Sequence, residues 1–410
     1  MRYFSYLSNA SQLLEQYQGK VPFSIFLKQF FSRQKKFGSN DRRQIARLCY
    51  GYFRLGHSLR QLPLQERILA GVFVSAQGPE ELLEQLKPEW NALTQLPVTE
   101  KLALAAGGEA APAPAGTGEA ELANIFPWAD RLSEGIDTAA FRTSFGIQPD
   151  LFLRLRPGKE AGVQRKLQLE GLSFEVLGPQ CLALPNSSRA DKVLDIDQEA
   201  VIQDHSSQRV GELLLLVKDQ LPEKPAVWDC CSGSGGKSIM AWDLLGPSIR
   251  LTVSDKRESI IHNLQERFRL AGMLQYKALV TDLTQLPPDK AAVPGGDGGK
   301  QLFPLIIADV PCTGSGTWGR TPDQLFFFAP EGIRSYSERQ KKIVQAALRQ
   351  LAPGGYFLYI TCSVFREENE DMIAFIQANS TLQLVKKELF TGYQRKADTL
   401  FAALFQSNTV

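Results

Sequence analysis

The sequence lacks the long apolar runs that membrane proteins need. In its 410 residues no apolar stretch approaches the ~18 to 20 residues that span a bilayer. The first ten residues also lack the charged, then apolar, then small-residue pattern of a secretory signal. We therefore expect a soluble, cytoplasmic protein that does not associate with a membrane.

Cysteine is scarce as well. Six Cys are too few for a disulfide framework, and Cys230 and Cys231, being adjacent, are poor partners for each other. No Cys-x-x-Cys occurs and no His lies beside Cys312 or Cys362 in the sequence, so we expect no metal site. Reduced thiols remain as candidates for chemistry. The three histidines are scattered, and we expect them to be structural rather than catalytic: His57, His205 and His262.

The composition is that of a folded protein with two or three domains. A hydrophobic content of 43% and a charged content of 22% argue against a disordered or fibrous chain. The net charge is only +2, but residues 1–60 carry eleven Lys and Arg against Glu15 and Asp41, interleaved with Tyr and Phe. Such a segment is either a phosphate-binding surface or a solvated helical face, and charge alone does not decide between them.

Periodicity divides the chain. Apolar residues recur at helical spacing from 8 to 60, and helical patterning with proline breaks continues to 104. Residues 105–121, rich in Ala, Gly and Pro, predict a flexible linker. The expected division is a helical domain, the linker, a small α+β element and an α/β core: 1–104, 105–121, 122–200 and 201–410.

Strand and helix patterns then alternate. A strand at 150–158, a helix at 159–172 and one or two strands at 174–184 predict the α+β element. From residue 226 onward at least five apolar strands are separated by helices, which predicts a parallel, doubly wound sheet. We expect residues 291–300 to be an exposed loop.

Ligands of such sheets bind beyond the carboxyl ends of the strands. The first strand is followed by a glycine-rich loop, Cys231–Lys237. It misses the phosphate-loop pattern because Cys231 stands where the first glycine belongs, and it is not G-x-G-x-x-G because Ser238 replaces the last glycine. The loop therefore favours a nucleoside ligand without a phosphate chain.

The next strands end in acids. Asp255 lies 26 residues after Asp229, where a carboxylate can accept hydrogen bonds from both ribose hydroxyls. The competing interpretation is a glycine turn followed by an exposed acidic helix cap. The third and fourth strands close with Asp282 and Asp309.

Two cysteines share this edge. Asp309 and Cys312 flank Pro311, which fixes φ and has no N–H to donate, and Cys362 ends the fifth strand. We expect the two thiols to converge over the ligand, whereas Cys49 and Cys181 are expected to pack as small apolar residues. For Trp318 stacking on a base and packing under its loop are equally open.

Several ordered motifs in residues 150–405 resemble the RsmB/Nop/Sun family of RNA cytosine-C5 methyltransferases. They are CSGSGGK (231–237), SDKRESIIHNLQERFRLAG (254–272), TDL (281–283), ADVPCTGSG (308–316) and ITCSVFREENE (360–370). QDHSSQ (203–208) and ADTLFAALF (397–405) are also similar to family segments, and residues 39–55 resemble the NusB-like helical domain of RsmB-type members. The glycine loop departs from the family's Ala-Ala-Pro-Gly-Gly-Lys, which leaves contacts to the methionine part of the cofactor open.

The resemblance implies a Rossmann-like class I methyltransferase core with a doubly wound, mainly parallel seven-stranded sheet, an N-terminal all-α domain and a small α+β element. It also implies S-adenosyl-L-methionine as methyl donor, with Asp255 at the ribose, Asp282 at the adenine, and Asp309 among the cofactor contacts. The loop residues that would surround the methionine and ribose are Cys231, Ser232, Gly233, Ser234, Gly235, Gly236 and Lys237.

The resemblance assigns the chemistry too. The nucleophile of the Thr-Cys-Ser motif is here Cys362, which would add to C6 of cytosine and so activate C5. Asp309 would bond the N3 and amino edge as a general acid, and Cys312 would assist release. Lys237 would either lower a thiol pKa or orient the loop.

The implied partner is RNA with a single-stranded or flipped-out cytosine, gripped by the basic N-terminal unit and the α+β element. Small-subunit ribosomal RNA is favoured over transfer RNA, and a monomer is the default. Three alternatives stay open: DNA cytosine methylation, a non-catalytic RNA-binding ribosome-assembly factor, and an exocyclic-amine methyltransferase that would be insensitive to Cys362→Ala.

Overall fold

The computed structural model describes the chain except residues 1, 35, 108–112, 288–289, 295–299 and 409–410. The chain divides into two compact units. Unit 1 comprises Met1–Leu132, Ile136–Gln148 and Thr317–Pro330. Unit 2 comprises Ser133–Gly135, Pro149–Gly316 and Glu331–Val410.

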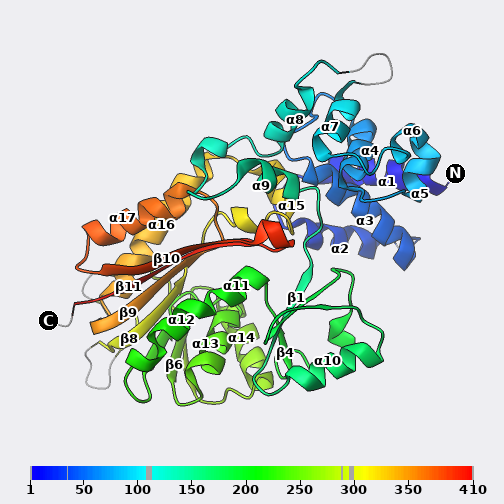
Figure 1. The fold of residues 1–410 in the computed structure, drawn as a ribbon. Coiled ribbons are helices and arrows are strands. Elements are labelled where there is room, and N and C mark those ends of the chain that lie inside the picture. The colour runs from blue at the N-terminus through cyan, green and yellow to red at the C-terminus, as the bar shows by residue number, and fades with distance from the viewer. Residues whose placement is uncertain (1, 35, 108–112, 288–289, 295–299, 409–410) are drawn as a thin grey trace. The chain divides into compact units, whose positions relative to one another are not determined.

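Unit 1 is helical (Figure 1), which confirms the all-α N-terminal region. Its core is made by the apolar faces of its first helices, where buried Phe, Leu and Tyr recur at helical spacing. The helices α3 and α4 cross closely at Gly51 and Gly71, since a Cβ atom on Gly71 would lie 2.4 Å from the carbonyl oxygen of Gly51. The α-helices of this unit are α1 (Arg2–Gln16), α2 (Phe23–Arg33), α3 (Ser39–Arg54), α4 (Leu64–Ser75), α5 (Glu81–Leu86), α6 (Pro88–Asn91), α7 (Val98–Gly107), α8 (Thr117–Ile125), α9 (Thr138–Ser144) and α15 (Pro322–Phe327).

The prediction of a flexible linker at 105–121 is wrong at both of its ends. Residues 105–107 belong to α7 and residues 117–121 belong to α8, and the two helices pack together within unit 1. A Cβ atom on Gly118 would lie 2.3 Å from the carbonyl oxygen of Thr99, so this glycine permits a close helix contact. Residues 108–112 lie outside the described residues. Because unit 1 runs on to residue 132, the chain does not divide at this segment.

The basic N-terminal segment is only partly a surface. Nine of its Lys and Arg side chains are exposed, but Arg54 is buried and Lys35 lies outside the described residues. The Arg54 guanidinium donates hydrogen bonds to the carbonyl oxygens of Phe145 at 3.0 Å and Ile147 at 3.2 Å. The hydrogen bonds of Arg54 therefore stabilise the fold of unit 1, and its buried side chain is not part of an exposed binding surface.

Unit 2 contains a small antiparallel sheet with strand order β2-β3-β1-β4. The strands are β1 (Leu151–Leu155), β2 (Glu175–Gly178), β3 (Cys181–Leu184) and β4 (Ala200–Ile202), and the helix α10 (Glu160–Leu169) packs on them through Val163 and Leu167. This is the expected α+β element, although it begins near residue 149 and not at residue 122.

The larger sheet of unit 2 has seven strands in the order β10-β11-β9-β8-β5-β6-β7. The five strands from β9 to β7 in this order are parallel, and β11 and β10 join antiparallel. The strands are β5 (Ala226–Asp229), β6 (Arg250–Asp255), β7 (Tyr276–Val280), β8 (Phe303–Asp309), β9 (Leu351–Thr361), β10 (Gln383–Thr391) and β11 (Thr399–Gln406). This confirms the doubly wound, mainly parallel sheet.

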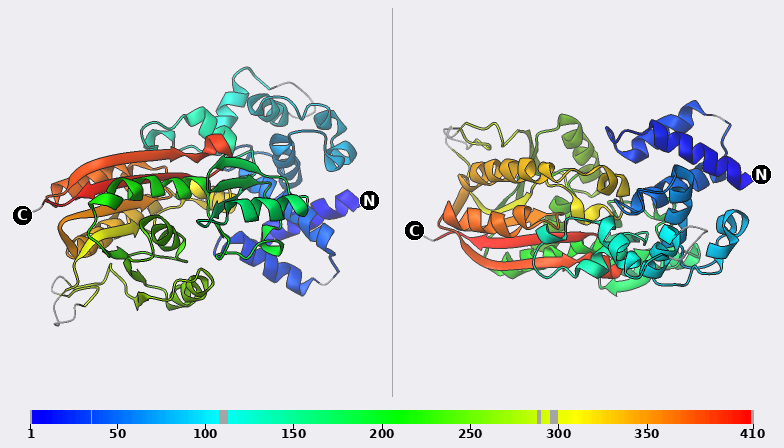
Figure 2. Two further views of the ribbon diagram at one scale, coloured as in Figure 1. Left: turned by 60° about the horizontal axis from the view of Figure 1, so that its bottom comes forward. Right: turned by 90° about the horizontal axis from the view of Figure 1, so that it is seen from above.

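Helices cover both faces of this sheet (Figures 1 and 2). Because side chains alternate along a strand, Val227 packs toward one helical layer and Trp228 toward the other. The first layer is α12 (Gly211–Val217), α13 (Gly236–Leu245) and α14 (Glu258–Leu270), and the second is α16 (Glu331–Leu348) and α17 (Glu370–Ala378). The short helix α11 (His205–Arg209) precedes α12.

The loop expected at 291–300 falls partly on residues 295–299, which lie outside the described residues; Pro294 and Lys300 are bridged as antiparallel partners. Across the described part of the chain, no helix combines the length and apolar character of a membrane span.

Candidate functional site at the carboxyl edge of the seven-stranded sheet

Every predicted site residue lies at one edge of unit 2. The glycine loop follows β5, Asp255 ends β6, Asp282 follows β7, and Asp309 ends β8. Cys312 follows β8 by three residues and Cys362 follows β9 by one. Because these five strands are parallel, their carboxyl ends meet at the same edge.

The glycine loop is tied to the end of β6. The N–H of Ser232 donates to the carbonyl oxygen of Ser254 at 2.9 Å, and its hydroxyl donates to the same oxygen at 3.2 Å. Gly233 and Gly235 have φ of +51° and +85°, a region in which other residues are strained. A Cβ atom on Gly233 or Gly236 would meet no atom within 4 Å, so open space adjoins the loop. The loop has the exposed backbone that a nucleoside ligand requires.

The two acids beyond the loop are neighbours. The N–H of Thr281 donates to the carbonyl oxygen of Asp255 at 3.0 Å. Burial works against the ionised Asp255, but its hydrogen bonds with Arg257 lower its pKa. Burial likewise opposes ionisation of Asp282, and the hydrogen bonds from Thr284 lower its pKa. Both groups are carboxylates at neutral pH, and each keeps lone pairs for ribose hydroxyls or an adenine amino group.

Lys237 connects the loop to Asp309. Its ammonium lies 2.7 Å from a carboxylate oxygen of Asp309 and donates to the hydroxyl of Ser207 at 3.2 Å. Burial opposes the ammonium charge, but the charge of Asp309 and the hydrogen bond with it outweigh burial and raise the pKa of Lys237. Lys237 is therefore a cation placed between the glycine loop and the edge that holds Asp309 and the two thiols.

Asp229 lies beneath this pair and is fully buried. It accepts a hydrogen bond from the hydroxyl of Ser238 at 2.6 Å, and its other oxygen is buried with no donor among the described residues. Burial raises the pKa of Asp229 to about 7. The group is therefore balanced between acid and carboxylate near neutral pH.

The two predicted thiols meet. The Sγ atoms of Cys312 and Cys362 lie 3.3 Å apart, and both side chains are partly buried. The hydrogen bond with Cys362 and burial raise the pKa of Cys312. Cys312 therefore stays protonated and can donate to the sulfur of Cys362.

A buried acid, Glu368, holds both cysteine loops. Its carboxylate accepts hydrogen bonds from the N–H and hydroxyl of Thr313, at 3.0 and 2.6 Å, and from the hydroxyl of Ser363 at 2.5 Å. Next to it Asn369 accepts from the hydroxyl of Thr361 at 2.6 Å and donates to the carbonyl oxygen of Ser363 at 2.9 Å. Thr361 and Ser363 flank Cys362, so its backbone is fixed from both sides.

Among the residues of this site that had no role in the predictions from sequence are Ser207, Glu368 and Asn369. They lie in QDHSSQ and ITCSVFREENE, two segments that resemble the family, and that was the only available signal. Trp318 is buried in unit 1 and packs against Phe328 and Trp128, so packing is the correct one of its two interpretations. The described residues hold no group of three or more His, Cys, Asp or Glu that could bind a metal ion.

The known proteins that this chain resembles are named as methyltransferases. Residues 216–405 match the sequence model of a family described as 16S rRNA methyltransferase RsmB/F. A Coxiella burnetii protein named probable ribosomal RNA small subunit methyltransferase B is 26% identical over 261 residues, which are 61% of this chain and 57% of that protein. A mouse protein named tRNA (cytosine(72)-C(5))-methyltransferase NSUN6 is 29% identical over 168 residues, 40% of this chain and 34% of that protein. The matches thus span about half or less of these relatives.

The fold is shared over nearly the whole chain with a solved structure. The crystal structure of the protein PH0851 superposes with a TM-score of 0.69 at 18% sequence identity, over 99% of this chain and 98% of that one. At this identity the likeness establishes the fold alone.

Proposed function

We propose, because residues 216–405 match the model of the RsmB/F methyltransferase family, that this protein is an RNA cytosine-C5 methyltransferase that uses S-adenosyl-L-methionine and acts on ribosomal RNA of the small subunit. The observation that carries the proposal is the pair of thiols, 3.3 Å apart, at the edge that also holds Asp309. Methylation of an exocyclic amine would need neither thiol.

Cys362 is the nucleophile in this proposal. Its thiolate adds to C6 of cytosine, the C5–C6 double bond opens, and C5 gains the electron pair with which it attacks the methyl donor. Lys237 supports the thiolate, since its ammonium is held beside Asp309, whose charge raises the pKa of Lys237. Asp309, held at 2.7 Å by Lys237, bonds the N3 and amino edge of the base as negative charge develops there.

Cys312 serves the release step. After methyl transfer the proton on C5 passes to solvent water, the electron pair of the C5–H bond re-forms the double bond, and the C6–S bond breaks to return the thiolate of Cys362. Cys312 is protonated before the reaction and lies beside the leaving sulfur, so it can donate a hydrogen bond to that sulfur as the bond breaks.

The cofactor fits the loop edge. S-adenosyl-L-methionine supplies an electrophilic methyl group on a sulfonium when bound. Residues 231–237 would hold its methionine part, where a Cβ atom at Gly236 would enter open space. The carboxylates of Asp255 and Asp282 would hold the ribose hydroxyls and the adenine amino group. This loop lacks the proline that the family carries there. Its absence affects only the proposed contacts with the methionine part of the cofactor.

The substrate is a cytosine outside a helical stack, because C6 cannot reach a buried thiol while the base is stacked. The name of the Coxiella relative favours ribosomal RNA. Transfer RNA is the second candidate, since the mouse relative is named for that activity. We propose unit 1 and the α+β element as RNA-binding parts, and a monomer as the working form.

The test follows labelled methyl groups into unmodified ribosomal RNA with wild type, Cys362→Ala and Cys312→Ala, and protein–RNA adducts on a denaturing gel. We expect no transfer with Cys362→Ala and an accumulating adduct with Cys312→Ala. Activity that survives both substitutions would refute the adduct mechanism. Cofactor binding by wild type without transfer to ribosomal RNA would point to transfer RNA next, and cofactor binding without transfer to any RNA would favour an assembly factor.

A further inference from the structure

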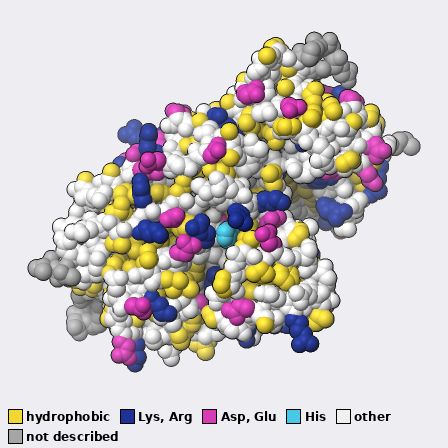
Figure 3. Space-filling model, viewed as in Figure 1, with side chains coloured by type: hydrophobic (Ala, Val, Ile, Leu, Met, Phe, Trp, Pro, Cys, Tyr) yellow, Lys and Arg dark blue, Asp and Glu magenta, His cyan; other side chains and the backbone are white. Residues whose placement is uncertain are grey.

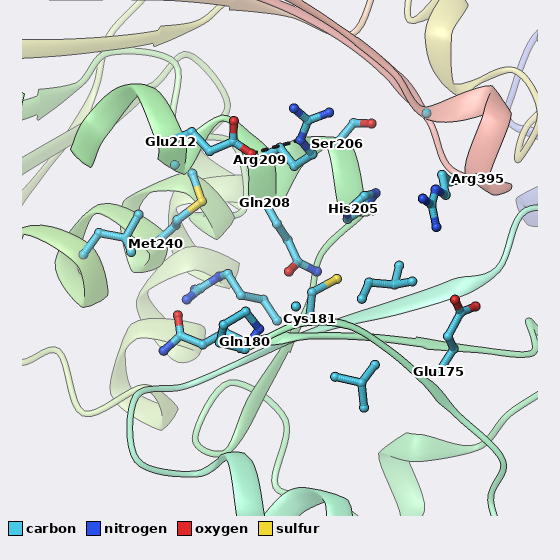
Figure 4. A pocket seen from close by; sticks show the side chains of 18 of the residues that line it. Glu175, Gln180, Cys181, His205, Ser206, Gln208, Arg209, Glu212, Met240 and Arg395 are labelled. Carbon is cyan, nitrogen blue, oxygen red and sulfur yellow. Dashed lines mark hydrogen bonds and ion pairs between the residues drawn. The ribbon is translucent and has the colours of Figure 1, made fainter. Parts of the chain in front are cut away.

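A cavity of about 670 Å³ lies in unit 2, separate from the cysteine edge. It is enclosed by the turn from β2 to β3, by α11 and the start of α12, by α13, and by residues 391–395 (Figure 4). Figure 4 shows Gln208 and Cys181 pointing toward one another, with Arg209, His205 and Arg395 along one side. The volume is that of ordinary small-ligand sites.

One wall carries a buried donor with no acceptor. Arg154 donates through Nε to Gln203 at 2.7 Å and through Nη1 to Asp243 at 2.6 Å. Its Nη2 is buried and has no partner among the described residues. A buried unpaired donor is costly, and Arg154 lines the cavity, so a ligand that offers an acceptor oxygen or nitrogen would satisfy it.

The opposite side carries two guanidinium groups, those of Arg209 and Arg395, and the carboxylates of Glu175 and Glu212 also line the cavity. Arg209 pairs with Glu212 at 2.9 Å and lies over the ring of Phe390, while Arg395 is exposed and has no ion pair within the described part of the chain. Burial lowers the pKa of His205, and both guanidinium groups act in the same direction. His205 is therefore neutral at pH 7. On the face drawn in Figure 3, basic and acidic side chains are interspersed.

The cavity and the cysteine edge share α11. His205, Gln208 and Arg209 line the cavity, whereas Ser207 of the same helix bonds the ammonium of Lys237 at 3.2 Å. Lys237 in turn holds Asp309. Only one short helix therefore separates the cavity from the residues that would hold the target base.

We propose that this cavity binds one nucleotide of the RNA strand close to the target cytosine, with its phosphate at Arg395 and Arg209 and its base edge at Gln180, Gln208 and Arg154. The proposal rests on the proposed function. A nucleotide supplies an anion for the guanidinium of Arg395 and an acceptor for Arg154. The amides of Gln180 and Gln208 already donate to Glu160 and to the carbonyl oxygen of Gln203, and each keeps one further N–H and an acceptor oxygen for a base edge.

The experiment measures binding of a seven-nucleotide single-stranded RNA with a central cytosine, and separately of cytidine monophosphate, by fluorescence competition. The variants are Arg395→Ala and Gly178→Phe. Gly178 lines the cavity and a Cβ atom there would meet no atom within 4 Å, so the added ring fills space without a clash at the backbone. The matched controls lie outside the α+β element and do not line the cavity: Arg269→Ala, an exposed arginine on α14, and Leu274→Phe, at an exposed apolar side chain.

We expect both cavity variants to bind the oligonucleotide roughly tenfold more weakly than wild type and to keep their affinity for the cofactor. The control variants should bind the oligonucleotide as wild type does. A photoreactive 4-thiouridine next to the cytosine should crosslink to residues 175–181 or 205–215. Unchanged oligonucleotide affinity in both variants overturns the proposal. Loss of cytidine monophosphate binding alone also overturns it, because a free nucleotide would then be the ligand. If the crosslinks form but no methyl group is transferred, the proposed function fails and the cavity assignment stands.

Discussion

Glu368 accepts two hydrogen bonds from Thr313, one from its N–H at 3.0 Å and one from its hydroxyl at 2.6 Å. Thr313 directly follows Cys312, and Glu368 lies six residues after Cys362. Because Glu368 also accepts from Ser363, a single buried carboxylate sets the distance between two loops that carry thiols on different strands.

We therefore expect Glu368→Ala to lower both stability and methyl transfer. The substitution leaves the donors of Thr313, Ser363 and Gln340 without their acceptor, at a cost of about 3 kcal/mol. Urea denaturation measures the stability, and labelled methyl transfer under conditions where the variant is folded measures kcat. We expect kcat to fall at least ~tenfold while cofactor affinity changes little, since positioning errors act on the reaction step.

Asp371→Asn is the matched control, because Asp371 is an exposed acid on the same stretch of chain. It should leave both quantities unchanged. A fully active, folded Glu368→Ala protein would contradict the positioning role.

Asp229 predicts a pH dependence of stability. Its folded-state pKa of about 7 lies above its usual value of 3.8, so the folded protein binds more protons than the unfolded chain between these values. The group's stabilising contribution is present at low pH and is lost as the pH rises through 7. Asp229→Asn removes this dependence, and we expect wild type to lose up to about 4 kcal/mol relative to the variant between pH 4 and pH 8.

Urea denaturation of both proteins at several pH values gives that difference. The contributions of all other ionisable groups cancel in it if they titrate independently of Asp229. A difference that is constant with pH would show that the Asp229 carboxyl titrates normally.

Lys237 and Asp309 should be coupled energetically. Asp309→Asn leaves the buried ammonium with a weaker partner, and Lys237→Met leaves the carboxylate without its cation. A double-mutant cycle in denaturation experiments should give a favourable coupling of about 1 kcal/mol, a modest value because the Asp309 side chain is one-third exposed. Strictly additive effects would mean that the 2.7 Å contact contributes nothing to stability.

The exposed basic residues of unit 1 should govern the salt dependence of RNA binding. Lys28 and Arg33 are exposed on α2, and replacing both by Glu should weaken RNA binding and flatten its dependence on salt concentration by about two phosphate contacts. Lys218→Glu, an exposed change in unit 2, is the control. Equal slopes for wild type and the double variant would leave α2 outside the RNA interface.

The strands of the core were predictable because each is a short apolar run that ends at a polar residue. The edge residues followed from one topological rule, that parallel strands end together, and this rule placed Cys312 and Cys362 side by side. The roles of Glu368 and Asn369 could not be found in this way, since their partners lie on loops whose approach is set by tertiary packing. Likewise Arg54 looked like surface charge, and only the fold reveals the carbonyl oxygens that it binds.

The linker prediction failed for a related reason. A segment rich in small residues is typical of a flexible chain, but Gly118 is small because α8 lies against the backbone of α7. Composition cannot distinguish a glycine that gives freedom from one that permits close packing. Similarly, His205 and Cys181 were predicted as ordinary structural residues, and the cavity that they line is formed by segments far apart in the sequence.

The position of α11 has a thermodynamic consequence. One face of this five-residue helix lines the cavity, and Ser207 contacts Lys237 at the glycine loop. If RNA in the cavity shifts α11, it shifts the partner of Lys237 too, and the two binding equilibria become linked. Linkage is reciprocal, so whatever factor RNA adds to cofactor affinity, the cofactor must add to RNA affinity.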